Sequence, residues 1–282
     1  MTTKSNLLEM QLEWAGRAGK VADKKGYLPS TAENLFQPLS PLTATAFAEG
    51  SGSETRDTPE RSAKMRALHS SAALAVNVFD YWTSQDAGAL LLALGLDAKP
   101  VSIQFEAKFP TGLEGNPPNL DVAFLFGGAA VVAVESKFSE WLTPKAPGKE
   151  LFKPKYFSST DGIWAAQGLK ACQELASQLQ TRTVSFRHLD VAQLLKHALG
   201  LGKQHPGHFE LYYIFFDCPG PESIIHRAEV EEFARRVGGD FTFRWVSYQD
   251  MFKVLTREAG PEHSAYMAYL RERYFSEVLP VA

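Results

Sequence analysis

The sequence has few of the features that define several protein classes. It contains only two cysteines, Cys172 and Cys218, which lie too far apart to indicate a disulfide framework or a zinc site. No apolar run approaches the roughly 20 residues that a membrane span requires. The residues after Met1 are charged and amphipathic and lack an apolar signal core. We therefore expect a cytoplasmic protein that binds no membrane.

A strong net charge, internal repeats and phosphate-binding glycine motifs are also absent. The net charge of -3 gives no global attraction to nucleic acid. The hydrophobic content of 45% and the length of 282 residues are nevertheless sufficient for a full core. Function therefore has to be inferred from local patterns.

The N-terminal part differs in composition from the rest. Residues 6–20 have the spacing of an amphipathic helix, and residues 26–57 are rich in Pro, Ser, Thr and Gly, as linkers are. Thr58-Pro59-Glu60 has the composition of a helix start, and apolar residues then recur at spacings of three and four to about Trp82. We expect a helix and linker extension over residues 1–57 and a main domain over residues 58–282.

The remaining pattern alternates between strands and helices. Strands are expected at residues 101–109, 119–126, 130–138, 208–217 and 241–246. Helices are expected at residues 163–179, 190–200, 224–237 and 248–274, the last with a break at Gly260-Pro261. The run at 208–217 is almost continuously apolar, which predicts a strand that is covered on both faces and parallel to the 130–138 strand. The order predicts an α/β fold with a central mixed β-sheet flanked by helices.

Charged residues interrupt the two apolar runs around Gly127-Gly128. Glu135 and Lys137 point to one face of their strand, ~7 Å apart. A two-residue turn would pair Asp121 with Val134, whereas a three-residue turn with a bulge would place Asp121 opposite Glu135. The sequence permits both registers.

Chemistry favours the second register. An Asp and a Glu with Cβ atoms ~5 Å apart would repel each other without a cation, and Mg²⁺ takes carboxylates while keeping positions open for phosphate. Lys137 would then steer or deprotonate a bound water, or stabilise a pentavalent phosphate. The competing interpretation is an exposed Glu-Lys pair on an antiparallel sheet, which contributes little free energy.

Asp121, followed after thirteen residues by Glu135-Ser136-Lys137 at the end of a valine-rich strand, resembles the motif of the PD-(D/E)XK nuclease superfamily. The usual proline is displaced to Pro117-Pro118. The resemblance implies a restriction-endonuclease-like core in which Asp121 and Glu135 bind Mg²⁺ or Mn²⁺, the Ser136 carbonyl adds a ligand and Lys137 is catalytic. It also implies an endo- or exodeoxyribonuclease that hydrolyses phosphodiester bonds of nucleic acid, with DNA the expected substrate. Cutting both strands would call for a homodimer.

Many superfamily members carry a third acid on the helix before the Asp strand, and that helix is where this sequence departs from the pattern. Glu106, on the polar side of the 101–109 strand, is the best substitute, although it also fits a surface glutamate beside Lys108. His69 borders the apolar stripe of the preceding helix. It either approaches the metal or a phosphate, or it is a hydrogen-bonded structural histidine.

Three further residues are expected to bind substrate. Lys153 and Lys155 lie among aromatic residues in a loop over residues 141–159, a composition that can hold phosphates and stack bases but also fits a loop pinned by its rings. Gln167 is expected at the active-site end of the 163–179 helix, where some relatives use a glutamine to orient the lysine or the substrate. The tyrosine that one branch carries four residues later is Ala171 here. The alternative function is a non-catalytic module that binds nucleic acid or protein.

Overall fold

The computed structural model describes residues 2–50, 53–146 and 151–276. The strands are β1 Ser102–Lys108, β2 Asn119–Leu125, β3 Val131–Lys137, β4 Phe209–Phe215 and β5 Thr242–Ser247. The helices are α1 Thr3–Arg17, α2 Pro41–Glu49, α3 Ser71–Phe79, α4 Gly88–Ala93, α5 Lys170–Gln180, α6 Val191–Gln204, α7 Pro221–Val237, α8 Tyr248–Glu258 and α9 Ser264–Tyr274. Residues 51–52 of the expected linker and 147–150 of the expected basic loop lie outside the described part.

The strands form one mixed sheet in the order β1-β2-β3-β4-β5. β1, β2 and β3 are antiparallel neighbours, and β4 and β5 continue the sheet parallel to β3. The prediction of an apolar strand parallel to the Glu135 strand is therefore confirmed by β4. The α/β class with a central mixed sheet is confirmed as well.

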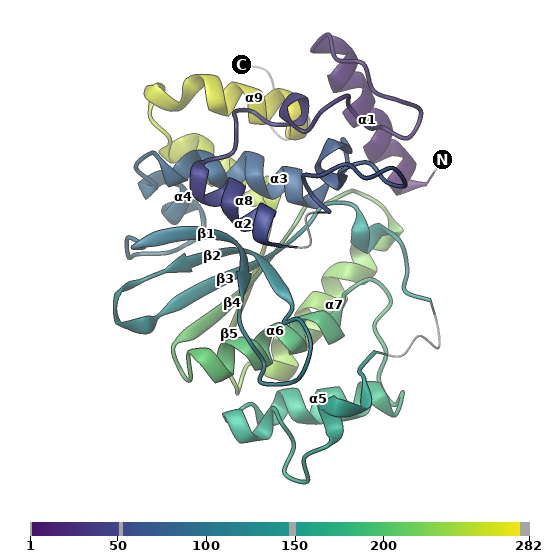
Figure 1. Ribbon diagram of the computed structural model, residues 1–282, viewed down its shortest axis with the longest axis vertical. Helices are drawn as coiled ribbons and strands as arrows, with labels where there is room; N and C mark the ends of the chain where they lie inside the picture. Colours follow the sequence, from purple (N-terminus) through teal and green to yellow (C-terminus); the bar gives the residue numbers. More distant parts are fainter. Residues whose placement is uncertain (1, 51–52, 147–150, 277–282) are drawn as a thin grey trace.

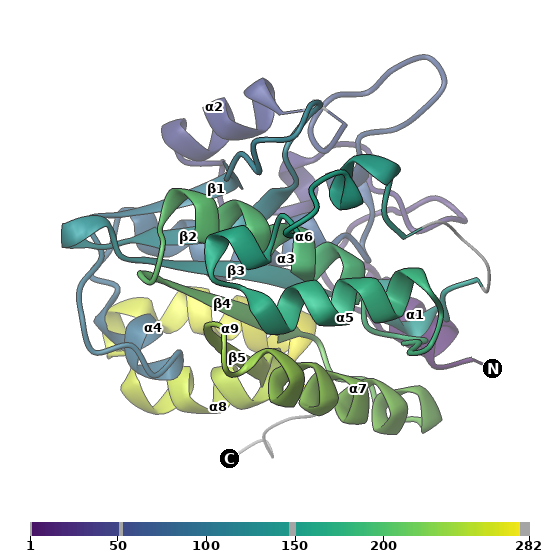
Figure 2. The same ribbon diagram turned by 90° about the horizontal axis from the view of Figure 1, so that it is seen from below.

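Helices cover both faces of the sheet (Figures 1 and 2), with α3, α4, α8 and α9 on one side and α5, α6 and α7 on the other. The ring of Phe79 in α3 packs against Phe124 of β2 on the first face, and the Tyr213 hydroxyl of β4 shares a hydrogen bond with His226 of α7 on the second. Because both faces are covered, β3 and β4 are buried along most of their length. This arrangement is that of a restriction-endonuclease-like core.

The N-terminal residues pack on the same core. The guanidinium of Arg273 in α9 is 1% exposed, donates to the Asn34 carbonyl at 2.7 Å and lies 4.3 Å from the ring centre of Trp14 in α1. Phe47 of α2 meets Phe105 of β1. Residues on both sides of position 57 thus share one set of contacts, and the division into an extension and a main domain stays a prediction.

The predicted helix start at Thr58-Pro59 is wrong. Thr58 and Arg61 instead exchange two backbone hydrogen bonds in a tight turn, and α3 begins only at Ser71, with the Ser70 hydroxyl as its N-cap. The backbone of the intervening segment pairs with residues 26–28, through bonds such as Leu28 N–H to the Arg66 carbonyl. Tertiary pairing overrides the local helix signal here.

Glycines explain two further errors. The helix expected from residue 163 begins at Lys170, because Gly168 adopts a left-handed conformation with φ of 80°. The helix expected to end at Gly200 continues to Gln204. A Cβ at position 200 would lie 2.2 Å from the carbonyl oxygen of Phe109, so this glycine permits close packing and does not terminate the helix.

Candidate active site

The β2-β3 hairpin brings the two predicted acids together. Its turn spans Gly127–Ala129, with Phe126 N–H bonded to the Ala130 carbonyl, and Val122 pairs with Val134. This is the three-residue register, so Asp121 lies opposite Glu135 on one face of the sheet. The Ser136 N–H donates to Asp121 Oδ2 at 2.7 Å, which fixes the Asp121 carboxylate against β3.

Glu135 and Lys137 form a buried pair. The Glu135 side chain is 2% exposed and that of Lys137 is 15% exposed, and Lys137 Nζ donates to Glu135 Oε1. A surface ion pair would be far more exposed, so the competing interpretation of an exposed Glu-Lys pair is wrong. Removing two charges from water carries a large desolvation cost, which surface pairs avoid.

The three charges shift one another's pKa values. Burial, and then the neighbouring Glu135 carboxylate, raise the pKa of Asp121 well above its ordinary value. Burial alone would raise the pKa of Glu135, but Lys137 and His197 lower it. Burial likewise opposes the charge of Lys137, yet Glu135 and Asp121 hold the pKa of Lys137 above its ordinary value. Lys137 is therefore a cation, and its charge balances Glu135.

Helix α6 supplies two side chains that the sequence did not point to. Gln193 Oε1 accepts a hydrogen bond from Lys137 Nζ at 3.1 Å, and His197 Nε2 lies 3.0 Å from Glu135 Oε2. A spacing of four places both residues on one face of the helix. That spacing was the available signal, but the sequence does not show which face of the sheet the helix covers.

Some buried polar atoms at this point have no hydrogen-bond partner. They are Glu135 Oε2 and both ring nitrogens of His197, because the 3.0 Å approach lacks the alignment of a hydrogen bond. An unpaired carboxylate oxygen beside a second carboxylate is the type of donor that a hard divalent cation binds. Within residues 2–50, 53–146 and 151–276, no three His, Cys, Asp or Glu side chains are grouped to hold a metal ion. The acid pair thus fits such a cation only if waters or backbone oxygens complete its coordination.

Glu106 lies in the same part of the sheet. The pairs Phe105–Val122 and Ala107–Leu120 place it opposite Asp121, but its backbone has φ of 49° and its carboxylate accepts from Asn119 Nδ2 at 2.6 Å. Burial raises the pKa of Glu106, and the Glu135 charge adds to this effect. Glu106 is close enough to interact electrostatically with the acid pair, and its role as a ligand stays a prediction.

Two further predicted site residues, Ser136 and His69, make contacts outside the acid pair. Ser136 is buried, and its hydroxyl shares a 2.7 Å hydrogen bond with Tyr248 on the opposite face of the sheet. His69 lines a cavity of about 170 Å³ together with Lys4 and Ser139, and its Nδ1 is buried without a partner. Their roles stay predictions.

Gln167 lies outside the helix that the sequence predicted for it, and its role in binding the substrate stays a prediction. It belongs to a short 3₁₀ turn before α5, and the Cβ of Gln167 lies 3.7 Å from the position that a Cβ on Gly202 would occupy. Gly202 is nine residues beyond Gln193 on α6, a distance of about 14 Å along the helix axis. The glutamine that contacts Lys137 is Gln193, through the hydrogen bond described above, and His197 follows it four positions later on α6.

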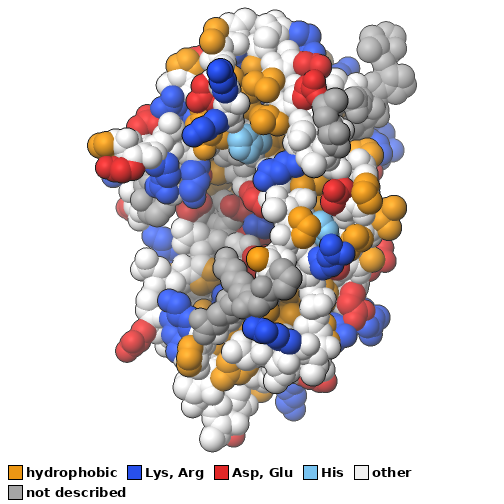
Figure 3. Space-filling view, turned by 90° about the vertical axis from the view of Figure 1, so that its right-hand side faces the viewer, with side chains coloured by type: hydrophobic (Ala, Val, Ile, Leu, Met, Phe, Trp, Pro, Cys, Tyr) orange, Lys and Arg blue, Asp and Glu red, His pale blue; other side chains and the backbone are white. Residues whose placement is uncertain are grey.

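The two predicted loop lysines lie in different environments. Lys153 is exposed, whereas Lys155 Nζ donates to the Glu114 carbonyl and lies 5.8 Å from the ring centre of Tyr156. Lys196 of α6 also approaches this ring, at 5.7 Å. Figure 3 shows a face on which Lys and Arg side chains surround a hollow that contains acidic side chains.

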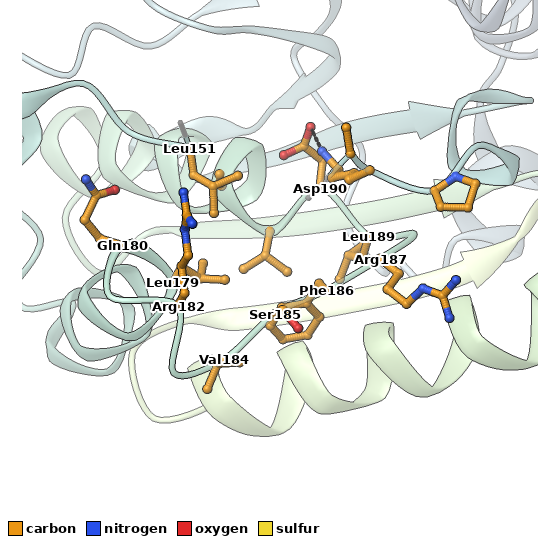
Figure 4. A pocket seen from close by; sticks show the side chains of 15 residues that line it. Leu151, Leu179, Gln180, Arg182, Val184, Ser185, Phe186, Arg187, Leu189 and Asp190 are labelled. Atoms are coloured by element: carbon orange, nitrogen blue, oxygen red, sulfur yellow. Dashed lines mark ion pairs between the residues drawn. The ribbon is translucent and has the colours of Figure 1, made fainter. Parts of the chain in front are cut away.

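A cavity of about 620 Å³ lies beside the start of α6. Figure 4 shows Leu151, Leu179 and Phe186 around it, with basic side chains at its sides. Asp190, the N-cap of α6, forms an ion pair with Lys145 at one side of the cavity. Since Gln193 lies one turn further along α6, the cavity adjoins the Lys137 end of the site.

None of the helices in the described residues is long and apolar enough to span a membrane. Comparison with curated proteins and with solved structures gives no match. Residues 7–275 match the family described as Restriction Endonuclease associating with ARP, a range that includes every residue of the site above. The chain therefore belongs to this restriction-endonuclease family.

Proposed function

We propose that the protein is a divalent-metal-dependent nuclease of the PD-(D/E)XK type that hydrolyses phosphodiester bonds of nucleic acid, with DNA the expected substrate. One observation carries the proposal: Asp121 and Glu135 face each other on adjacent strands, and the ammonium group of Lys137 is held against Glu135. Family membership supports the same conclusion.

Asp121 and Glu135 are the residues that would hold Mg²⁺ or Mn²⁺. The Ser136 carbonyl and Glu106 are further candidates, with water completing the shell. When bound, such an ion lowers the pKa of a water molecule that it holds, and it supplies positive charge that stabilises the scissile phosphate. The repulsion that raises the pKa of Asp121 would then be relieved, because a divalent cation balances both carboxylates.

Lys137 is proposed to act through its positive charge. Its pKa is held above the ordinary value, so it is a poor general base at neutral pH. An ammonium group fixed by Glu135 and Gln193 is instead suited to stabilise the charge that develops on the phosphate. Of the two roles expected for Lys137, this one is favoured.

Basic groups near the site suit a nucleic-acid substrate. Lys196 lies over the rings of Phe152 and Tyr156, and the neighbouring cavity combines apolar walls with Lys145 and Arg187. The rings of Phe152 and Tyr156 are themselves buried against Trp164 and pin the loop, so the cations are the groups that would accept phosphates. Lys153 and Lys155 belong to the same loop and are proposed to contact the backbone of the substrate.

The proposal is tested with purified protein, supercoiled plasmid and single-stranded DNA, in Mg²⁺ or Mn²⁺ and in EDTA. The wild type is expected to cleave at least one substrate only with metal, and Asp121→Ala and Lys137→Ala to abolish cleavage. Arg271→Ala in α9, an exposed residue on the other side of the sheet from α6, serves as a control that keeps the acid pair and removes one surface charge. Cleavage that survives both site substitutions would exclude this site.

A non-catalytic module that binds nucleic acid or protein is the second candidate. It is favoured by the fact that both Glu135 oxygens already face nitrogen atoms, of Lys137 and His197. Calorimetry separates the two, because the module would bind DNA but take up no Mn²⁺ at millimolar concentration. A homodimer, needed for cutting both strands, stays a prediction.

A further inference from the structure

We propose that His197 is a positioning residue that orients the Glu135 carboxylate and thereby sets how tightly the site holds a divalent cation. This inference rests on the proposed function, since it concerns the same carboxylate. It assigns a role to a residue outside the sequence motif.

The first observation is the geometry of the pair. The His197 side chain is fully buried, and its Nε2 lies 3.0 Å from Glu135 Oε2 without the alignment of a hydrogen bond. Buried polar atoms are nearly always paired, so an acid and an imidazole at this distance are expected to form a hydrogen bond with each other. A small rotation of either group would complete the bond.

The second observation is how the two Glu135 oxygens are used. Oε1 accepts from Lys137, while Oε2 has no partner and is the oxygen that faces His197. A carboxylate held at both oxygens has one orientation, and this orientation determines where its remaining lone pairs point. Groups that hold a metal ligand in this way typically contribute about 10- to 100-fold in metal affinity.

The third observation is that a single helix holds both members of the strand pair. Gln193 of α6 accepts from Lys137, and His197, one turn further along α6, lies against Glu135. Because each of these two α6 residues contacts a different member of the pair, their substitutions should have different effects on metal binding and on cleavage. Loss of the His197 contact should weaken metal binding, whereas loss of the Gln193 contact should leave metal binding intact and slow cleavage at saturating metal.

The test is calorimetric titration of the metal-free full chain with Mn²⁺. His197→Leu is expected to weaken Mn²⁺ binding by about 10- to 100-fold. His197→Gln should recover most of the affinity, because its amide nitrogen reaches about as far as the imidazole Nε2. His197→Asn should not, since its amide is one methylene shorter. Gln193→Leu is the matched control on the same helix and should bind Mn²⁺ like the wild type.

Folding is checked on each metal-free variant by circular dichroism. His197→Asn and His197→Gln keep a polar group at this position, so their comparison remains decisive if His197→Leu does not fold. Folded Leu and Asn variants that bind Mn²⁺ as tightly as the wild type would overturn the positioning role alone. Loss of affinity in all three variants, with no recovery by Gln, would overturn it in favour of direct coordination by imidazole. A wild type that binds no Mn²⁺ would overturn the proposed function and this inference together.

Discussion

Replacing His226 by glutamine is expected to make folding much less sensitive to mild acid. His226 of α7 is fully buried, its Nε2 lies 2.8 Å from the Tyr213 hydroxyl, and its ring stacks on Trp141 at 4.4 Å. Burial, with a smaller contribution from His188, lowers the pKa of His226 from 6.5 to about 3. The folded protein therefore keeps this imidazole neutral in a pH range where the unfolded chain protonates it.

The sign and size follow from linkage. Because the folded pKa lies below the unfolded one, the unfolded state binds more protons as pH falls, and stability falls with it from about pH 7 toward pH 3. With the two pKa values of 6.5 and about 3, lowering the pH from 7 to 5 costs about 2 kcal/mol from this residue. Arg227 also lowers the pKa of His226, whereas Asp217 raises it.

The measurement is urea unfolding at half-unit steps between pH 5 and 7, extrapolated to water. His226→Gln keeps a partner for the Tyr213 hydroxyl but does not titrate, so its stability should fall by about 2 kcal/mol less than that of the wild type over this range. Subtracting the free energy of unfolding of one protein from that of the other removes the contribution of every other titrating group, because those groups are present in both. Equal slopes for both would refute the account of a neutral, buried His226.

Three further predictions concern stability. Asp121→Asn should be more stable than the wild type in urea unfolding at pH 8 without metal, because the raised pKa of Asp121 in the folded state makes the wild type lose stability as pH rises. Saturating Mg²⁺ should narrow this difference in stability, because it should stabilise only the wild type. Gly200→Ala should lower the free energy of unfolding by about 1–3 kcal/mol, since its Cβ would lie 2.2 Å from a backbone oxygen. Gly16→Ala in α1, with nothing within 4 Å of its Cβ, should raise the free energy of unfolding by about 0.5–1 kcal/mol, and equal melting temperatures for the two variants would contradict this. Arg273→Met should lose about 3 kcal/mol or more because several buried acceptors lose their charged donor, whereas the exposed Arg271→Met should stay within about 0.5 kcal/mol of the wild type in the same assay.

The strands were predictable because their signal is local. Alternation over residues 101–109 and the apolar run at 208–217 each depend on a few neighbouring side chains, and both correspond to strands of the sheet. The hairpin register was not decided by the sequence, because Gly127-Gly128 allows two turns. The structure uses the longer turn, in which Ala129 adopts φ of 67°, a conformation that a residue other than glycine seldom takes.

The helix boundaries failed where tertiary contacts outweigh local signals. Thr58-Pro59 has the composition of a helix start, yet Thr58 closes a tight turn with Arg61, and residues 66–68 then pair with residues 26–28. Gly200 is the kind of residue that ends a helix, yet it lies inside α6 against Phe109, the residue that follows β1. A glycine can serve chain reversal or close approach, and one sequence does not distinguish these uses.

The candidate site divides in the same way. Asp121, Glu135 and Lys137 follow from a motif within seventeen consecutive residues, so the sequence contained them. Gln193 and His197 lie more than fifty residues further on, and their role depends on which face of the sheet α6 covers. Gln167 was chosen on the assumption that the first helix after β3 carries the contact, whereas the second helix does.

The energetics of the acid pair argue that it is retained for function. A buried ion pair replaced by apolar residues of similar volume is often neutral or stabilising, and here Glu135 Oε2 and His197 carry the added cost of unpaired polar atoms. Asp121 adds to this cost, because burial and Glu135 disfavour its charged form. A chain selected for stability alone would have apolar residues at these positions, as it has at most other positions of β2 and β3. Buried charge at the covered centre of a sheet, with unpaired polar atoms and a basic surface beside it, supports the proposal that this site takes up a cation and a phosphate.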